Sequence, residues 1–328
     1  MMTLVRNRRS WLALSVLGLA LLVPSVTTAR GRHKGLCAAT QPGVPVYVAI
    51  MSAFPGETAP LAAATEITDT VTVEDRQYYI GRLEGVNVIL GLTGIGLVNA
   101  DMRTRSVLKN FDVAAVIMDG VAGGLQKRIA DVLVADRWVE SKPDGSFRPN
   151  RALFALAQRG QAALPAPLEK CTTVRPSVSR TPVCLSYDPT VTVGGLGTSS
   201  DGFKGTAFPC IPGGGPIFGC DLPRPMTTDE VVQTVDNETA SVARAAARRG
   251  VPFLGVRSCS DGPGDPFGDR GFDAFYDFYR LAAKNASIVT RSVLAELHAV
   301  ATDGSAHGTC RLLTQRQWRR AAQRIADR

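Results

Sequence analysis

The chain has 328 residues, of which 45% are hydrophobic and 20% are charged, so it can build one substantial core and is not a disordered chain. Its formal net charge of +8 comes from the two ends, because the first 29 residues contribute three arginines and the last 18 contribute a net +5. The part between them is balanced in charge, which argues against a basic face for nucleic acid.

The N-terminus has the pattern of a secretory signal. Three arginines precede an apolar run from Trp11 to Val26, and the small residues that follow, up to Ala29, suit a cleavage site. The alternative is an uncleaved membrane anchor, for which the run is short. We therefore expect residues 1–29 to be removed on export, which would leave residues 30–43 as a polar lead-in. The mature protein would be secreted or lie in the periplasm or cell envelope, without a stable membrane span.

The first predicted strand, Val44 to Met51, is apolar and rich in β-formers. Glu57 follows in the first strand-to-helix connection. If the strands are parallel, this connection lies at the sheet edge where open α/β folds bind ligands. From the pattern alone, a capping or first-turn glutamate is the better interpretation of Glu57.

A hairpin is predicted from Tyr78 to Leu83 and Val86 to Leu92, with its turn at Glu84 and Gly85. The segment T-G-I-G-L-V-N-A, which begins at Thr93, then turns into a helix. Its backbone N–H groups could bind an anion or ribose hydroxyls. It lacks the third glycine of a dinucleotide-binding fingerprint, so no such cofactor is predicted.

Two further strands, Val113 to Met118 and Val132 to Ala135, flank the glycine-rich segment G-V-A-G-G-L that begins at Gly120. Glycines at such a place let backbone or ligand approach closely. From about 140 to 226 the chain is rich in Pro, Gly, Ser and Thr and holds four of the seven cysteines. We interpret this region as a cysteine-rich loop insertion, not a second domain, with one strand at Val191 to Val193.

An exported chain can form disulfides, and all seven cysteines follow the predicted cleavage site. Cys259 ends a predicted buried strand and is the one we expect to be unpaired. The pattern leaves the connectivity of the other six open, since six cysteines allow about 15 pairings. The pairs we favour are Cys171 with Cys184, Cys210 with Cys220, and Cys37 with Cys310.

The most informative stretch runs from Val235 to Asp261. Asp236 suits a helix N-cap, alanines recur at helical spacing, and a glycine follows where the helix would end. The apolar segment Val251 to Val256 is typical of a strand buried on both faces in a parallel sheet. Glu238 at the helix start and Asp261 just past the strand are therefore the first candidates for chemistry.

The C-terminal part is predicted to be helical. Apolar residues repeat at intervals of three and four from Phe275 to Leu297, which indicates a long helix packed on the sheet. Residues 311–328 form a basic, amphipathic pattern, for which a solvated terminal helix is the preferred interpretation. Because strands and helices alternate, we expect an α/β layered fold in a single domain, residues 44–310.

Four segments carry a family resemblance: T-G-I-G-L-V-N-A from 93, G-V-A-G-G-L from 120, V-D-N-E-T-A from 235 and V-P-F-L-G-V-R-S-C-S-D from 251. In this order they resemble the nucleoside phosphorylase and nucleosidase superfamily, and most of all its 5'-methylthioadenosine/S-adenosylhomocysteine nucleosidases. The resemblance covers roughly Val46 to Trp138 and Val191 to Leu297, without the cysteine-rich insertion. It implies a three-layer α/β/α fold with a central twisted mixed sheet. Dimers are usual in these nucleosidases, so it also suggests a homodimer.

The resemblance implies roles for the residues at matching positions. Asp261, held in place by Ser260, would donate a proton to N7 of a purine. Glu57 would position the attacking water, and Glu238 would bind the ribose hydroxyls. Further substrate contacts would come from Phe203 on the base, Thr93 near the water, Asn237 where the nucleosidases commonly have methionine against the ribose, and Gly123.

These residue types suit the cleavage of an N-glycosidic bond. Positive charge develops on the sugar and negative charge on the departing base, so the site needs an acid for the base and carboxylates for the oxocarbenium. Glu57 must be ionised and Asp261 protonated, so their environments should drive their pKa values apart. We therefore expect an exported enzyme that hydrolyses a purine nucleoside of the adenine type and needs no cofactor.

Two alternatives stay open at this stage. Phosphorylases of this fold resemble one another in having a Gly-Asp-Pro loop after the first strand and arginines for phosphate. The loop here has Glu57 and no arginine, which favours water. The second alternative is a protein that binds or takes up nucleosides without cleaving them, since the superfamily includes exported members of that kind.

Metal chemistry fits the sequence less well. His33, His298 and His307 are too scattered for a metal site, and no Cys-x-x-Cys pair occurs. Asp261, Asp265 and Asp269 do not have the spacing of a known calcium loop. We therefore predict no metal site, and a small-molecule nucleoside as the partner.

Overall fold

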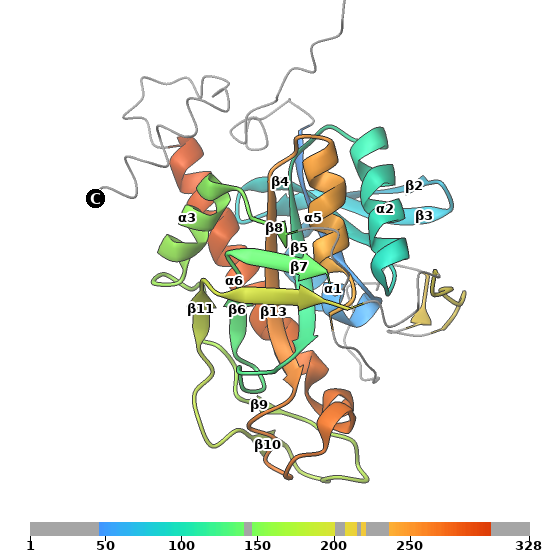
Figure 1. Cartoon of the computed structure of the whole chain (residues 1–328). Helices are drawn as coiled ribbons and strands as arrows, with labels where there is room; N and C mark the ends of the chain where they lie inside the picture. The colour runs from blue at the N-terminus through green and yellow to red at the C-terminus, as the bar shows by residue number, and fades with distance from the viewer. Residues whose placement is uncertain (1–45, 141–145, 201–206, 215–217, 221–235, 303–328) are drawn as a thin grey trace, which may run out of the picture. The chain divides into compact units, whose positions relative to one another are not determined.

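The computed structural model describes residues 46–140, 146–200, 207–214, 218–220 and 236–302, and the statements below concern these residues (Figure 1). Their main feature is an eight-stranded sheet with the strand order β11-β6-β13-β5-β1-β4-β3-β2. In chain order its strands are β1 (Tyr47–Ser52), β2 (Glu66–Val73), β3 (Arg76–Leu83), β4 (Val86–Leu92), β5 (Val113–Gly123), β6 (Val132–Val134), β11 (Val191–Val193) and β13 (Phe253–Asp261).

The centre of the sheet is parallel. β1 pairs with β4 and with β5, and β5 pairs with β13, all in the same direction. All nine residues of β13 are buried, as a strand covered on both faces requires. β2, β3 and β4 are antiparallel neighbours, and β6 runs antiparallel to β13, so the sheet is mixed as expected. The carboxyl ends of the four central strands consequently meet at one edge.

Helices cover both faces of the sheet. α2 (Leu97–Asn110) and α5 (Thr239–Arg248) pack together on one face, while α1 (Pro55–Ala64) and α3 (Arg151–Gly160) pack on α6 (Phe275–Thr302) at the other (Figure 1). Successive residues of a strand serve opposite faces. Ile50 joins a core cluster with Val289 of α6, whereas its neighbour Met51 joins a cluster with Ala243 of α5. This is the predicted three-layer α/β/α architecture.

The region predicted as a loop insertion contains a helix that was not predicted, α3, and the predicted strand Val191–Val193, which is β11. α3 is an amphipathic helix with Asn150 as its N-cap, because the Asn150 side chain accepts hydrogen bonds from the backbone of Ala152 and Leu153. β11 is an edge strand of the main sheet and pairs with β6. The remaining short elements are β7 (Arg137–Glu140), β8 (Ser146–Phe147), β9 (Cys171–Thr172), β10 (Val183–Cys184), β12 (Leu196–Ser199) and the 3₁₀ turn η2 (Gly271–Ala274).

Two cysteine pairs lie at disulfide distance, Cys171 with Cys184 and Cys210 with Cys220, as predicted. Cys259 is buried and unpaired, also as predicted. The third predicted pair, the N-terminal signal, the lead-in and the C-terminal helix lie outside the described residues. None of the helices described has both the length and the apolar character that a membrane span needs.

Candidate active site

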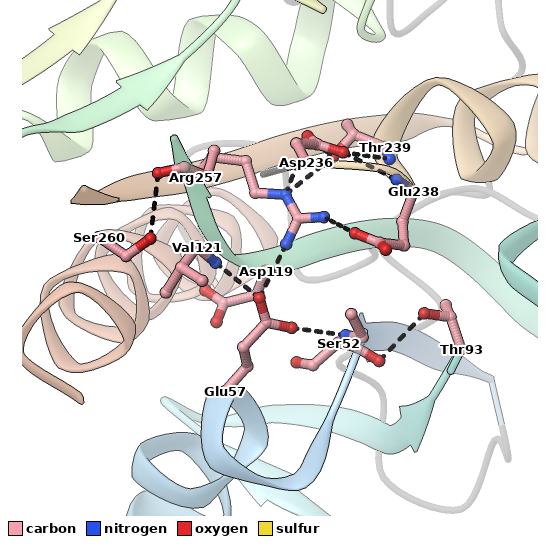
Figure 2. A network of polar contacts seen from close by, with 12 residues as sticks. Ser52, Glu57, Thr93, Asp119, Val121, Asp236, Glu238, Thr239, Arg257 and Ser260 are labelled. Carbon is pink, nitrogen blue, oxygen red and sulfur yellow. Dashed lines mark hydrogen bonds and ion pairs between the residues drawn. The ribbon is translucent and has the colours of Figure 1, made fainter. Parts of the chain in front are cut away.

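The carboxyl ends of the central strands bring polar residues from distant parts of the chain together (Figure 2). β1 leads directly into the first turn of α1, which carries Glu57. β5 contributes the segment from Asp119 to Gly123, and β13 contributes the segment from Arg257 to Asp261. Since β5 and β13 pair in register from Phe253 onwards, Arg257 lies beside Gly120. The predicted sheet edge is therefore where the chemistry-bearing side chains meet.

Arg257 lies at the centre of this group with only 1% of its side chain exposed. Its Nη1 lies 3.2 Å from Glu57 Oε1, its Nη2 lies 3.0 Å from Glu238 Oε2, and its Nε lies 3.2 Å from Asp236 Oδ2. Burial alone would lower the pKa of Arg257, but the three surrounding carboxylates raise it above its usual value. The guanidinium thus stays charged and joins acids from three segments.

Glu57 belongs to the first turn of α1, just after the strand-to-helix connection in which it was expected. Its Oε2 accepts a hydrogen bond from Ala53 N at 2.5 Å, and its Oε1 accepts one from Val121 N at 2.7 Å. Burial outweighs Arg257 and the two N–H groups, so the net shift of the pKa of Glu57 is upward. The pKa of Asp261 also shifts upward, so the expectation that the two environments drive these pKa values apart is not supported. The close approach requires glycine at 120, where a Cβ would lie 2.2 Å from Glu57 Oε1.

The side chains of Asp236 and Glu238 bind different backbone groups at the start of α5. Asp236 Oδ1 accepts the backbone N–H groups of Glu238 at 2.8 Å and of Thr239 at 3.0 Å, so Asp236 caps the start of α5 from two residues before the N-cap position, which Glu238 occupies. The Glu238 side chain is therefore available elsewhere, and its Oε1 accepts Gly96 N at 2.8 Å. Burial raises the pKa of Glu238 to about 8, although Arg257 acts to lower it.

Asp261 is the last residue of β13, where we had expected it just past the strand. The hydroxyl of Ser260 donates to Asp261 Oδ1 at 2.7 Å, which fixes the carboxyl group, and donates at 3.3 Å to the carbonyl of Ala122. Burial raises the pKa of Asp261, and the Ser260 hydrogen bond lowers it. The net effect is upward, so Asp261 holds its proton more readily than an exposed aspartate does.

A pocket of about 610 Å³ opens beside these residues, a volume that suits a small organic molecule. Asp236, Arg257 and Asp261 line it, together with Gly123 and Trp138. Part of its wall, residues 194–198, lies in the predicted insertion, at the point where the second range of the nucleosidase resemblance, Val191 to Leu297, begins. Among the described residues Glu57 and Glu238 do not line the pocket themselves, but both contact Arg257, which does.

The other predicted substrate residues have mixed outcomes. Gly123 lines the pocket. Thr93 is buried, and its hydroxyl donates to the carbonyls of Ser52 and Gly94 instead of pointing at Glu57 (Figure 2). Asn237 is buried between Asp236 and Glu238, and its Oδ1 accepts the Ser200 hydroxyl at 2.8 Å.

Phe203 lies outside the described residues. For Thr93 and Asn237, contact with substrate therefore stays a prediction.

Two charged residues of the site were missed. Arg257 and Asp119 are each embedded in a strand that is otherwise apolar, in V-P-F-L-G-V-R and V-A-A-V-I-M-D. Charged side chains are almost never fully buried unless they are paired or functional. A single ionisable residue inside a buried strand was the signal that could have identified both.

Comparison with known proteins places this geometry in a family. The family model described as the Phosphorylase superfamily matches residues 47–295. An uncharacterized protein of Mycobacterium tuberculosis is 35% identical over 194 residues, which are 52% of this chain and 75% of that protein. A 5'-methylthioadenosine/S-adenosylhomocysteine nucleosidase of Marinomonas sp. is 26% identical over 257 residues, 75% of this chain and 97% of that enzyme.

Solved structures agree on the fold. The 5'-methylthioadenosine/S-adenosylhomocysteine nucleosidase of Neisseria meningitidis, in complex with methylthio-immucillin-A, matches with a TM-score of 0.53 at 21% identity, over 76% of this chain and 99% of that one. Futalosine hydrolase of Helicobacter pylori matches with a TM-score of 0.53 at 19% identity, over 77% and 98% of the two chains. Since the family match spans most of the sheet and all the residues that surround Arg257, this chain belongs to the phosphorylase superfamily.

Proposed function

We propose that this protein hydrolyses the N-glycosidic bond of purine nucleosides, with water as the attacking group. One observation carries the proposal: Arg257 joins Glu57 to Glu238 at the wall of a pocket that Asp261 also lines. A group that can protonate a departing base and carboxylates that can stabilise a cationic sugar are thus assembled together. The similarity to nucleosidases that act on adenine nucleosides, as their names state, favours an adenine-type base.

The acids have different tasks in this reaction. Asp261, oriented by Ser260 and with its pKa raised by burial, donates a proton to N7 of the purine. Glu57, as a carboxylate, orients the water that attacks the sugar carbon and stabilises the positive charge that develops there. Glu238 accepts hydrogen bonds from the ribose hydroxyls. Arg257 holds Glu57 and Glu238 in position and favours their ionised forms.

The charge of the site favours water over phosphate. Three carboxylates, those of Glu57, Asp236 and Glu238, surround the single guanidinium of Arg257, whose charge they already share. A phosphate dianion next to this group would meet negative charge without an arginine fork of its own. A neutral water molecule carries no such penalty.

A panel of purine nucleosides, assayed with and without phosphate, tests this function. We expect free base to appear without phosphate, at the same rate when phosphate is added. Release that depends on phosphate would identify a phosphorylase instead. Binding without release would identify a nucleoside-binding protein, and such binding would be unchanged in Asp261→Asn.

We also propose that the protein is exported after removal of residues 1–29 and that it forms a homodimer. The N-terminal pattern and the two cysteine pairs at disulfide distance support export. Expression of the full chain in a secreting host should yield a mature protein whose intact mass is that of a chain beginning at Arg30. A full-length mass in the membrane fraction would contradict cleavage, and sedimentation of the mature protein tests the dimer.

A further inference from the structure

Asp119 is a buried acid to which the proposed reaction assigns no task. It lies near the carboxyl end of β5 and is 0% exposed. The two residues that follow Asp119 both contact the Glu57 carboxylate. Gly120 leaves room for this carboxylate, and Val121 N donates a hydrogen bond to it at 2.7 Å. The charge of Glu57 acts on Asp119, and Figure 2 draws both residues in the same group of polar side chains.

The two oxygens of Asp119 have different surroundings. Oδ1 accepts a hydrogen bond from the hydroxyl of Thr290 on α6 at 2.6 Å. Oδ2 is fully buried and has no hydrogen-bond partner within the part of the chain that the structure describes. An ionised carboxylate with one bare oxygen would be costly there, whereas a neutral carboxyl group places its proton on Oδ2 as a donor.

The charges around Asp119 decide which acid of the pair keeps the proton. Glu57 on α1 and Arg257 on β13 act on Asp119, while α6 contributes the neutral Thr290, whose hydroxyl donates to Asp119 Oδ1. Asp236 and Glu238 act on Glu57 from the start of α5. Burial and the charge of Glu57 together raise the pKa of Asp119 to about 8, although Thr290 and Arg257 act to lower it.

The two acids also differ in the donors that they accept. Glu57 accepts two backbone N–H groups and one contact from Arg257. Asp119 accepts a single hydroxyl. The carboxylate with more donors is the better ionised, so the negative charge of the pair belongs on Glu57.

We propose that Asp119 is a positioning residue for Glu57: its neutral carboxyl group donates from Oδ2 toward the Glu57 carboxylate, directly or through one ordered water, and holds the single negative charge of the pair on Glu57. This inference rests on the proposed function for the role of Glu57. The ionisation of Asp119 itself does not depend on that role, which allows the two ideas to be tested separately.

Two substitutions at this position separate its hydrogen bond from its bulk. Asp119→Asn keeps an acceptor for Thr290 and offers an N–H donor in place of the carboxyl proton. Asp119→Leu has a similar size and offers neither. We expect Asp119→Asn to retain kcat within about threefold at pH 6.5, and Asp119→Leu to lose about tenfold, the loss of one hydrogen bond.

The pH profile gives a readout that a merely structural role would not change. Without a donor from residue 119, Glu57 is a weaker acid. The acidic limb of kcat/KM should therefore move to higher pH in Asp119→Leu and stay in place in Asp119→Asn. The control is Asp112→Asn, the same substitution at an exposed position before the other end of β5, which should match the wild type.

Infrared difference spectra of the intact protein test the ionisation without any substrate. At pH 7 the wild type and Asp112→Asn should show a protonated carboxyl band that Asp119→Asn lacks, and this band should fade as the pH passes about 8. The proposal is overturned if no such band disappears in Asp119→Asn, or if both Asp119 variants keep the activity and pH profile of the wild type. If the wild type cleaves no nucleoside, the proposed function fails, and the spectra still decide the ionisation of Asp119.

Discussion

At the residue scale, the environment of Asp261 sets its chemistry. A carboxyl group that is largely removed from water and fixed by one hydroxyl keeps its proton at higher pH than an exposed one. The same residue on a solvated turn would be ionised and could not protonate a leaving base. The burial of the last position of β13 is therefore part of the proposed mechanism.

Asp261→Asn tests this directly. The amide has the same shape, so we expect the fold and the KM for a purine nucleoside to change little. The rate constant kcat should fall by about 10²- to 10⁴-fold, the range for the loss of a general acid. Steady-state assays of base release measure both values, and Asp265→Asn in the loop beyond the strand is a control. A kcat close to that of the wild type would remove Asp261 from the chemistry.

Glu238 and Asp261 stood out in the sequence because Glu238 begins a well-marked helix and Asp261 ends a well-marked strand. Arg257 could not be placed, because the three acids that justify its burial lie at positions 57, 236 and 238. No local pattern reports that a residue on one strand will meet a helix start 200 positions away. The motif around Thr93 could be recognised in the sequence, but the direction of its hydroxyl, which donates to nearby carbonyls, could not.

At the element scale, the strand β13 fixes the positions of both Arg257 and Asp261. Because β13 is buried along its whole length, a substitution of Arg257 changes the balance of buried charge and not an exposed surface. The negative charges of the three acids around Arg257 are compensated by its positive charge.

Arg257→Met should therefore destabilise the fold strongly, and more so as the pH rises. Without the guanidinium, the pKa values of the buried acids rise further in the folded state, so folding requires proton uptake and loses stability toward alkaline pH. We expect a loss of about 3–5 kcal/mol near pH 8, the cost of breaking a buried ion pair, and a smaller loss at pH 5. Urea denaturation at both pH values measures this.

The exposed Arg249→Met is the matched control for this experiment and should lie close to the wild type at both pH values. An equal loss of stability at pH 5 and pH 8 in Arg257→Met would show that packing, and not charge compensation, is the function of Arg257.

The insertion is attached to the start of α6 by ion pairs and by a small core. Arg175 contacts Asp277 at 2.9 Å and Asp273 at 3.1 Å, and Val174 and Leu185 pack against Phe278. The Cys171–Cys184 pair closes the loop that carries these contacts. The segment is thus a small unit docked on α6.

Cys184→Ser, combined with Cys171→Ser, should lower the free energy of unfolding by about 3 kcal/mol, the value expected for a closed loop of this length. Denaturation under oxidising conditions measures the difference. The same comparison in a reducing agent is the control, because both proteins then lack every disulfide. A difference of the same size under reducing conditions would mean that the bond is not formed in the purified protein.

The elements themselves were predictable to different degrees. β5 and β13 were located because continuous apolar runs mark buried parallel strands, but both extend past the apolar run into polar site residues. β2 was missed because its segment E-I-T-D-T-V-T-V is mostly polar and has one solvated face, with only β3 as a neighbour. α3 was missed because glycine, proline and cysteine around it dominate the composition of the region.

At the scale of the whole molecule, the fold is what brings the acids together. The order β13-β5-β1-β4 places the ends of segments from four parts of the chain at one edge, and the sequence of motifs alone does not determine that order. The layered α/β class could be predicted from the alternation of elements. The strand β11 was also predicted, but its place at the edge of the main sheet and the pocket wall after it were not, because they follow a region whose composition is typical of a loop.

The central claim is that water attacks the sugar carbon of a bound nucleoside. Single-turnover cleavage in H₂¹⁸O, followed by mass spectrometry of the products, tests it most directly. We predict one ¹⁸O atom in the released sugar, none in the purine base, and the same result whether or not phosphate is present. Release of a sugar phosphate with no ¹⁸O at the anomeric carbon, or no cleavage at all by the mature protein, would contradict the account.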